Sequence, residues 1–69
     1  MQITSASDMN GDDIRAKSKI KMWIEQKEYT AVVTGFEHYK GNIVRVVAIL
    51  DDDGTEVKAF SDSVVRFRS

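Results

Sequence analysis

Few residues of this chain could do chemistry, and they favour binding over catalysis. The chain has one histidine, His38, and no cysteine, so a catalytic arrangement would have to be built around that single imidazole. A nucleophile needs a base within hydrogen-bond reach and a third group that orients the base. No serine stands beside His38 in the sequence, and we therefore predict that the protein is not an enzyme.

Metal and cofactor sites are also poorly supported by the residue types present. The lack of cysteine excludes the usual zinc sites. The acidic run Asp51-Asp52-Asp53-Gly54 lacks the alternating oxygen ligands and flanking helices of a calcium-binding EF-hand. An aspartate followed by glycine is instead typical of a hairpin turn. We expect neither a metal nor a cofactor.

Tyr39 is the side chain best placed to contact a ligand. It ends a strand-like segment, beside the turn signal Lys40-Gly41-Asn42. An aromatic ring at a loop tip can stack on an unpaired nucleic-acid base, a contact worth about 1–3 kcal/mol. By contrast, Trp23 and Phe67 lie within apolar patterns, and we predict that both are core aromatics.

The segments before residue 25 set the start of the domain. Residues 1–11 are rich in small polar side chains, which predicts a flexible N-terminal arm before a domain over 12–69. Residues 12–17 fit one helical turn, because an aspartate at its start would meet the positive end of the helix dipole. Residues 19–24 alternate like a half-buried strand but also fit a helical stripe; we favour the strand.

The rest of the chain predicts a meander of strands, with Gly35 marking a bend or bulge. The segment 43–50 is apolar except for Arg45, which is typical of a central strand covered on both faces. Asp53-Gly54 predicts a type I′ hairpin, and residues 61–63 predict a 3₁₀ turn. Further strands are expected over 29–39, 55–60 and 64–67. The fold class is thus mostly β: a small five-stranded SH3-like barrel with a short N-terminal helix.

Length and composition point to self-association inside the cell. A chain of 69 residues buries only about 60% of its unfolded surface, and such domains usually need a disulfide, a metal or oligomerisation. With no cysteine, oligomerisation is the route left, and no proline protects an edge strand. No apolar run approaches the roughly 20 residues of a membrane span. We expect no membrane partner and a cytoplasmic location.

Charge is uneven along the chain although the net charge is only −1. Basic residues gather between Arg15 and Lys27 and again at the C-terminus, whereas Asp51, Asp52, Asp53 and Glu56 form an acidic group. Segregation of this kind can give a folded domain one basic and one acidic face. The other interpretation, that both sets are merely solvated, stays open.

Two segments resemble the paired motifs of the Sm/LSm family. Residues 35–44 (GFEHYKGNIV) resemble its first motif, Gly-Phe-Asp followed by Met-Asn and an apolar strand. Residues 57–65 (VKAFSDSVV) resemble its second, an apolar strand ending in Ile-Arg-Gly, then Asp/Asn-x-Val, with Phe60-Ser61 in place of Arg-Gly. The Phe-Asp-x-Phe run of the bacterial Hfq branch is similar to residues 36–39. The resemblance implies an Sm-like barrel in rings of five to seven copies.

The same resemblance implies a site for single-stranded RNA. Tyr39 would stack on a base, Asn42 would hydrogen-bond a base edge, and Asp62 would contribute from the second motif, which is how unpaired bases are commonly read. The remaining residues of the expected RNA-binding set lie in the same two motifs: His38, Lys58 and Phe60.

Two functions therefore stay open. The first is a ring-forming Sm-like protein, a homo-oligomer that binds U- or A-rich single-stranded RNA. The alternative is an SH3-like protein–protein interaction module, such as a small regulatory protein of a mobile element. The near-zero net charge and the acidic turn suit the alternative at least as well.

Overall fold

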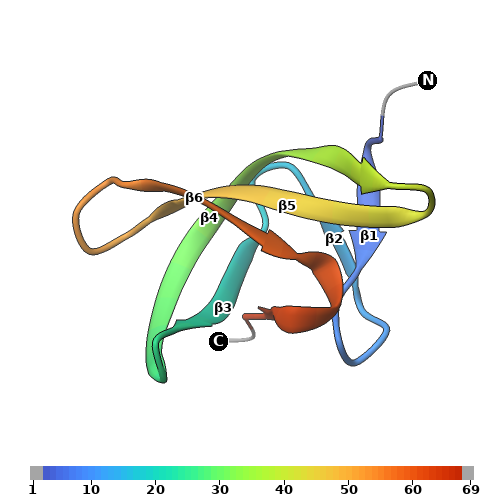
Figure 1. Ribbon diagram of the computed structural model, residues 1–69. Helices are drawn as coiled ribbons and strands as arrows, with labels where there is room; N and C mark the ends of the chain where they lie inside the picture. Colours follow the sequence, from blue (N-terminus) through green and yellow to red (C-terminus); the bar gives the residue numbers. More distant parts are fainter. Residues whose placement is uncertain (1–2, 68–69) are drawn as a thin grey trace.

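The computed structural model describes residues 3–67, which form two antiparallel sheets (Figure 1). A two-stranded sheet pairs β1 (Ser5–Ser7) with β2 (Asp13–Arg15). A five-stranded sheet has the order β6-β5-β4-β3-β7. Its strands are β3 (Lys19–Ile24), β4 (Lys27–Lys40), β5 (Ile43–Leu50), β6 (Glu56–Phe60) and β7 (Val65–Arg66). The prediction of a mostly β domain is confirmed.

The larger sheet curls around the core, with β4 as its long central strand (Figure 1). Alternate residues of each strand point inward, and these are the buried ones. No strand pairing joins β6 to β7 within residues 3–67, so the sheet is open between these two edges. The buried core comprises Ile14, Ile20, Met22, Ala31, Val33, Val46, Ala48, Leu50 and Val64.

The bend expected at Gly35 is a β-bulge. Val33 pairs with Ala48, but the next paired position is Gly35 with Val47, so Thr34 is the extra residue. A Cβ added at Gly35 would meet nothing within 4 Å. The bulge therefore bends β4, and the lack of a side chain at Gly35 is not what permits it.

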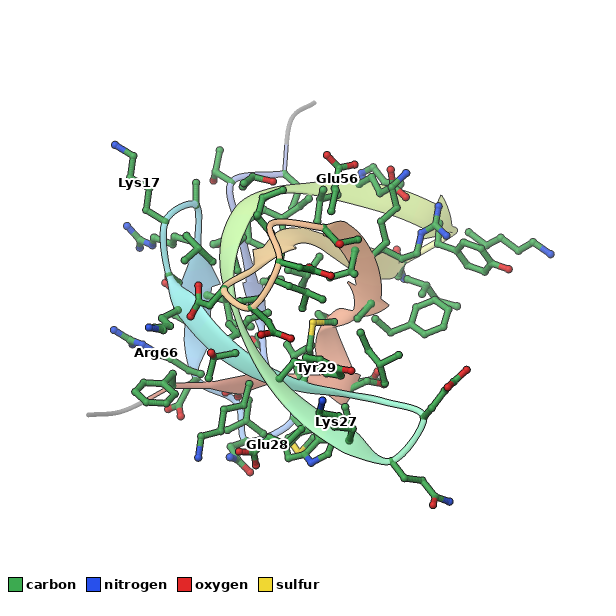
Figure 2. All side chains as sticks on the ribbon, turned by 90° about the vertical axis from the view of Figure 1, so that its left-hand side faces the viewer. Lys17, Lys27, Glu28, Tyr29, Glu56 and Arg66 are labelled. Carbon is green, nitrogen blue, oxygen red and sulfur yellow. The ribbon has the colours of Figure 1, made fainter. Side chains whose placement is uncertain are left out.

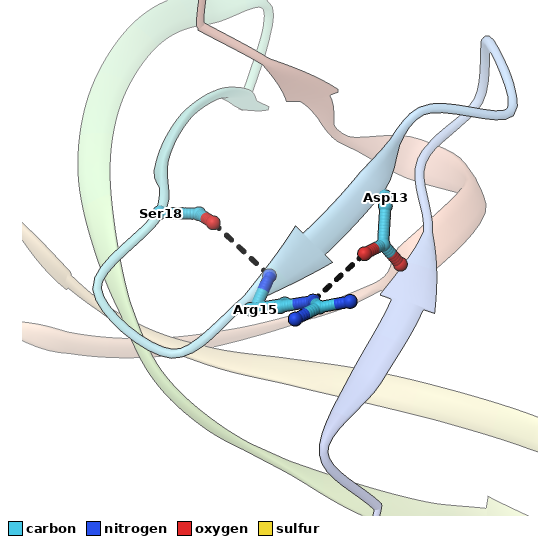
Figure 3. Close-up of polar contacts among 3 residues, drawn as sticks. All are labelled: Asp13, Arg15 and Ser18. Atoms are coloured by element: carbon cyan, nitrogen blue, oxygen red, sulfur yellow. Dashed lines mark hydrogen bonds and ion pairs between the residues drawn. The ribbon is translucent and has the colours of Figure 1, made fainter.

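The expected helical turn over residues 12–17 is wrong, and no α-helix occurs in the part of the chain that the structure describes. Residues 13–15 form β2 instead, because alternation buries Ile14 completely while its neighbours stay exposed. Asp13 and Arg15 pair across the exposed side at 2.9 Å, and the Ser18 hydroxyl accepts the Arg15 N–H at 3.0 Å (Figure 3). Among the described residues, no helix is long and apolar enough to span a membrane.

Residues 3–11 also differ from the predicted flexible arm. β1 pairs with β2, and the turn between them is organised by Asp8, whose side chain is only 5% exposed. One carboxylate oxygen accepts the N–H groups of Asn10 and Asp12 at 2.8 Å each, and the other accepts the Arg66 N–H at 2.7 Å. The N-terminal hairpin is thereby tied to β7; residues 1–2 of the predicted arm lie outside the described residues.

The strand interpretation of 19–24 is confirmed, and its hairpin to β4 turns through Glu25 and Gln26, both with positive φ (51° and 70°). The expected type I′ turn at Asp53-Gly54 is wrong, because only Gly54 has a positive φ, 75°. Residues 51–54 form a longer loop in which the Gly54 N–H donates to the Leu50 carbonyl at 3.0 Å. The 3₁₀ turn is confirmed as η1 (Ser61–Ser63), which connects β6 to β7.

Three predictions of burial are wrong. β5 is an interior strand, but its outer face is not fully covered, since Ile43 is 48% exposed. Trp23 is 46% exposed, because it alternates with Met22 and so faces away from the core. Phe67 is half-buried and lies beneath two lysine side chains rather than in the core cluster.

Candidate functional site

The strongest grouping of functional side chains lies on the outer face of β4, β5 and β6. Glu37, Arg45 and Phe60 stand directly opposite one another on these three strands. Residues opposite each other in antiparallel strands share one face and contact across it. Tyr39 lies two positions beyond Glu37 and returns to the same face. We name this surface, formed by Glu37, Tyr39, Arg45, Lys58 and Phe60, the Tyr39 patch.

Aromatic rings and cations alternate within the Tyr39 patch. The Tyr39 and Phe60 rings meet edge to face, with centroids 5.3 Å apart and an interplanar angle of 77°. The Arg45 guanidinium carbon lies 4.9 Å from the centre of the Tyr39 ring, and the Lys40 Nζ lies 5.9 Å from it. Tyr39 is 46% and Phe60 is 40% exposed, so both rings offer surface to a ligand.

One carboxylate holds the cations of the patch together. Glu37 pairs with Arg45 through one oxygen and with the Lys58 Nζ through the other, at 3.3 Å for the latter. Partial burial raises the pKa of Glu37, but the Lys58 hydrogen bond and the charges of Arg45 and Lys58 outweigh it and lower that pKa below 4.5. Glu37 is therefore ionised at neutral pH. Two cations thus share one carboxylate, and Lys40 beside the Tyr39 ring adds a third positive charge, so that cations outnumber the carboxylate here.

The structure brings together three of the six residues expected to bind RNA: Tyr39, Lys58 and Phe60. His38 precedes Tyr39 on β4 and so points to the opposite face. Asn42 lies in the exposed β4–β5 turn and Asp62 in η1. Within residues 3–67, no hydrogen bond, ion pair or ring contact joins either of them to the Tyr39 patch.

Arg45 is the residue of the Tyr39 patch that the motifs do not indicate. Where the second Sm/LSm motif has Arg-Gly, this chain has Phe60-Ser61, and a cation lies instead on the neighbouring strand, where Arg45 faces Phe60. A sequence signal for it does exist, because Arg45 is the only charged residue in the apolar run 43–50. A charge there must face outward unless it is paired.

A second feature is a hollow of about 360 Å³ between the β3–β4 hairpin and the β5–β6 loop. Figure 2 labels Lys27, Glu28 and Tyr29 at this part of the molecule. Hydrogen bonds from Lys19 at 3.1 Å and Thr30 at 2.9 Å lower the pKa of Asp51 below its ordinary 3.8. Among the described residues, no group of three or more potential metal ligands is found. The hollow is lined by Lys27, Glu28, Tyr29, Thr30, Asp51 and Asp52.

No protein-family model, curated protein or solved structure matches this chain. The resemblance to the Sm/LSm motifs therefore rests on residues 35–44 and 57–65 alone.

Proposed function

We propose that the protein binds single-stranded RNA, preferably U- or A-rich, through the Tyr39 patch. The observation that carries this proposal is the Arg45 guanidinium lying 4.9 Å from the centre of the exposed Tyr39 ring, with Phe60 beside it. Unpaired bases are commonly bound by stacking on aromatic rings and on arginine planes. Lys40, Arg45 and Lys58 provide positive charge for the backbone phosphates.

Two properties of the patch suit a single strand better than a duplex. The rings lie on the open outer face of a sheet, where splayed bases can approach each ring surface. The patch is also small, since it spans one residue position on each of three adjacent strands plus Tyr39 and Lys58. A small area with few cations gives modest affinity per copy.

Assembly would raise that affinity. We propose that the curled five-stranded sheet is an SH3-like barrel of the Sm type in a cytoplasmic protein, and that rings of five to seven copies form through its edge strands. Several patches on one RNA would then act together, because the second binding event becomes intramolecular. The support for the ring is the motif resemblance and the edge of β6, which pairs with no further strand within residues 3–67.

Fluorescence anisotropy with labelled oligo-U and oligo-A tests the proposal. We expect Tyr39→Ala to weaken binding about tenfold, since a base–aromatic stack contributes about 1–3 kcal/mol. Lys58→Ala should reduce the slope of log affinity against log salt by about 0.7, the value for one phosphate contact on a single strand. Unchanged binding in Tyr39→Ala and Phe60→Ala would remove the Tyr39 patch as the site.

Matched controls come from exposed side chains away from the patch. Met9→Ala removes an exposed apolar side chain near the N-terminal hairpin turn, and Lys27→Ala removes a lysine whose Nζ lies 5.1 Å from the Tyr29 ring. Both variants should bind oligo-U as the unmodified protein does. Circular dichroism of each variant shows whether the fold is kept.

The second candidate, an SH3-like protein interaction module, is favoured by the hollow beside the β5–β6 loop. Its lining has one ring, one cation and three carboxylates, an excess of negative charge that suits a basic peptide: Tyr29, Lys27, Glu28, Asp51 and Asp52. This candidate predicts that the purified protein carries no nucleic acid, so its 260/280 nm absorbance ratio would be that of protein alone. If the purified protein retained RNA and the purified Tyr39→Ala variant did not, the result would favour the Tyr39 patch over the hollow.

A further inference from the structure

The outer face of β3 carries a second array of cations and rings, separate from the Tyr39 patch. Ile20 and Met22 are buried, so the alternate residues Lys19, Lys21 and Trp23 face outward on the same strand. β7 lies next to β3, and the Phe67 N–H donates to the Lys19 carbonyl at 2.8 Å. We name the surface formed by Lys19, Lys21, Trp23 and Phe67 the Trp23 face.

Phe67 holds the two lysines of the Trp23 face in place. The Nζ of Lys19 lies 5.6 Å and that of Lys21 lies 5.4 Å from the centre of the Phe67 ring. Ammonium groups at this distance are attracted by an aromatic ring, so two flexible side chains converge on one point. Converging cations of this kind are prepared for an anion such as a phosphate group.

The charge balance also favours an anionic ligand. Lys19 shares its charge with Asp51 at 3.1 Å. Lys21 makes no ion pair within residues 3–67, so its charge is available to a ligand. The only acidic residue opposite an outward residue of β3 in the pairing with β4 is Glu28, across from Trp23.

Trp23 adds an exposed aromatic ring to the Trp23 face. A ligand made of phosphates alone would not use such a ring, whereas a nucleic-acid base could stack on it. It is 46% exposed, follows Lys21 by two positions, and so points to the same side about 7 Å along the strand. An exposed ring beside cations is the arrangement that binds single-stranded nucleic acid, in which each base provides a face for stacking. We propose that the Trp23 face is a second nucleic-acid contact surface, where Lys19 and Lys21 bind phosphates and Trp23 stacks on a base.

This inference rests on the proposed function, because it assigns the same RNA to a second surface. Both surfaces lie on outward residues of one five-stranded sheet, the Tyr39 patch on β4–β6 and the Trp23 face on β3 and β7. Small barrels that bind single strands contact about 4–16 nucleotides. A strand of that length has bases for both surfaces, within one copy or between neighbouring copies.

Tryptophan fluorescence tests the Trp23 face directly, because Trp23 is the only tryptophan of the chain. Oligo-U of about 16 nucleotides is titrated into the full chain while anisotropy and tryptophan emission are recorded together. We expect saturable quenching with the same midpoint as the anisotropy change, and no quenching by inorganic polyphosphate, which has no bases. Lys21→Ala should raise the midpoint severalfold and reduce the salt slope by about 0.7.

The outcomes separate the two proposals. RNA binding that depends on Tyr39 but leaves Trp23 emission unchanged would overturn the Trp23 face and keep the Tyr39 patch. Equal quenching by polyphosphate would overturn base stacking at Trp23. The absence of any anisotropy change would count against the proposed function itself. Trp23→Phe should retain most of the affinity that Trp23→Ala loses, whereas Lys27→Ala serves as the charge control.

Discussion

At Arg45 a single guanidinium takes part in two kinds of contact. It pairs with Glu37 and lies 4.9 Å from the centre of the Tyr39 ring. Asp8 similarly joins the N-terminal hairpin to β7, because its buried carboxylate accepts three backbone N–H groups from the two elements. Arg45 therefore organises the exposed site, and Asp8 organises the end of the core.

Replacing Asp8 should destabilise the fold strongly. In Asp8→Asn an amide group replaces one carboxylate oxygen, so at least one of the three N–H groups loses its charged acceptor. Hydrogen bonds to charged groups contribute about 1.5–3 kcal/mol each, and we expect a loss of about 2–3 kcal/mol. Urea unfolding measures it. Asp13→Asn is the control, because its ion pair with Arg15 is exposed and should change stability by less than about 0.5 kcal/mol; equal losses in both variants would contradict the role of Asp8.

Acid should weaken the fold through three carboxylates. Partial burial raises the pKa of Glu37, but Lys58 and Arg45 outweigh it and lower that pKa below its ordinary value. Lys19 and Thr30 lower the pKa of Asp51, and Thr55 lowers the pKa of Asp53. A group with a lowered pKa stabilises the fold above its ordinary value, and this contribution is lost as the pH falls through the folded pKa. Stability should thus be constant near neutral pH and fall below the range 3.8–4.5. A urea midpoint that stays level down to about pH 3 would contradict this.

At the scale of the element, the turns and the bulge decide how the strands are placed. The β3–β4 hairpin uses Glu25 and Gln26 with positive φ, where asparagine and glycine are preferred. The sequence could not reveal this turn, since neither residue is a turn signal. The bulge at Thr34, by contrast, was indicated by Gly35 although a Cβ there would be tolerated.

The β3–β4 turn should accept a stabilising change. The double change Glu25→Asn and Gln26→Gly places residues suited to positive φ at both positions. Relief of the strained backbone should stabilise the fold by about 1 kcal/mol or more. Thermal unfolding checks the prediction, and an unchanged or lowered melting temperature would count against backbone strain at Glu25 and Gln26.

Gly35 and Gly54 should respond in opposite directions to alanine. Gly35→Ala meets no neighbouring atom and needs no positive φ, so it should stabilise the fold by about 0.4–1 kcal/mol by reducing the freedom of the unfolded chain. Gly54 has a φ of 75°, and Gly54→Ala should destabilise the fold by about 1 kcal/mol or more. Unfolding curves of the two variants test the contrast, which a loss of stability in Gly35→Ala would refute.

At the scale of the whole molecule, the proposed nucleic-acid binding depends more on the rings and cations of the outer sheet face than on the net charge of −1. Basic and acidic residues are only partly segregated, because Lys19 pairs with Asp51 of the acidic group. Two surfaces nevertheless combine exposed rings with cations, the Tyr39 patch and the Trp23 face. Within residues 3–67 the edge of β6 pairs with no further strand, whereas at the edge of β7 the Arg66 N–H is taken by the Asp8 carboxylate.

Light scattering coupled to size exclusion should find an oligomer. Pairing of β6 with another copy would satisfy the backbone groups at its open edge, and the proposed ring has five to seven times the 7.8 kDa mass of the chain. Glu56→Pro in the edge strand β6 removes an exposed backbone N–H that points away from β5 and should favour the monomer. A monomer at micromolar concentration in the unmodified protein would contradict the ring.

The sequence by itself determined the order of the strands from residue 19 onward, the bulge near Gly35 and the 3₁₀ turn at 61–63. These features depend on alternation and on turn residues that act locally. From the sequence we also predicted Tyr39, Lys58 and Phe60 as binding residues, and these three lie together in the Tyr39 patch. The helical turn at 12–17 was wrong because local preference was overridden by contacts distant in sequence: Asp8 with Arg66, and Ile14 with the core.

Only the tertiary structure decided which side chains share a face. Arg45 meets Tyr39 because the bulges of β4 set its register against β5, and a shift of one residue would move every side chain to the other face. Trp23 is exposed for the same reason, since the phase of β3 is fixed by the burial of Ile20 and Met22. Strand register is a property of pairing between strands, and it is therefore settled only when the sheet forms.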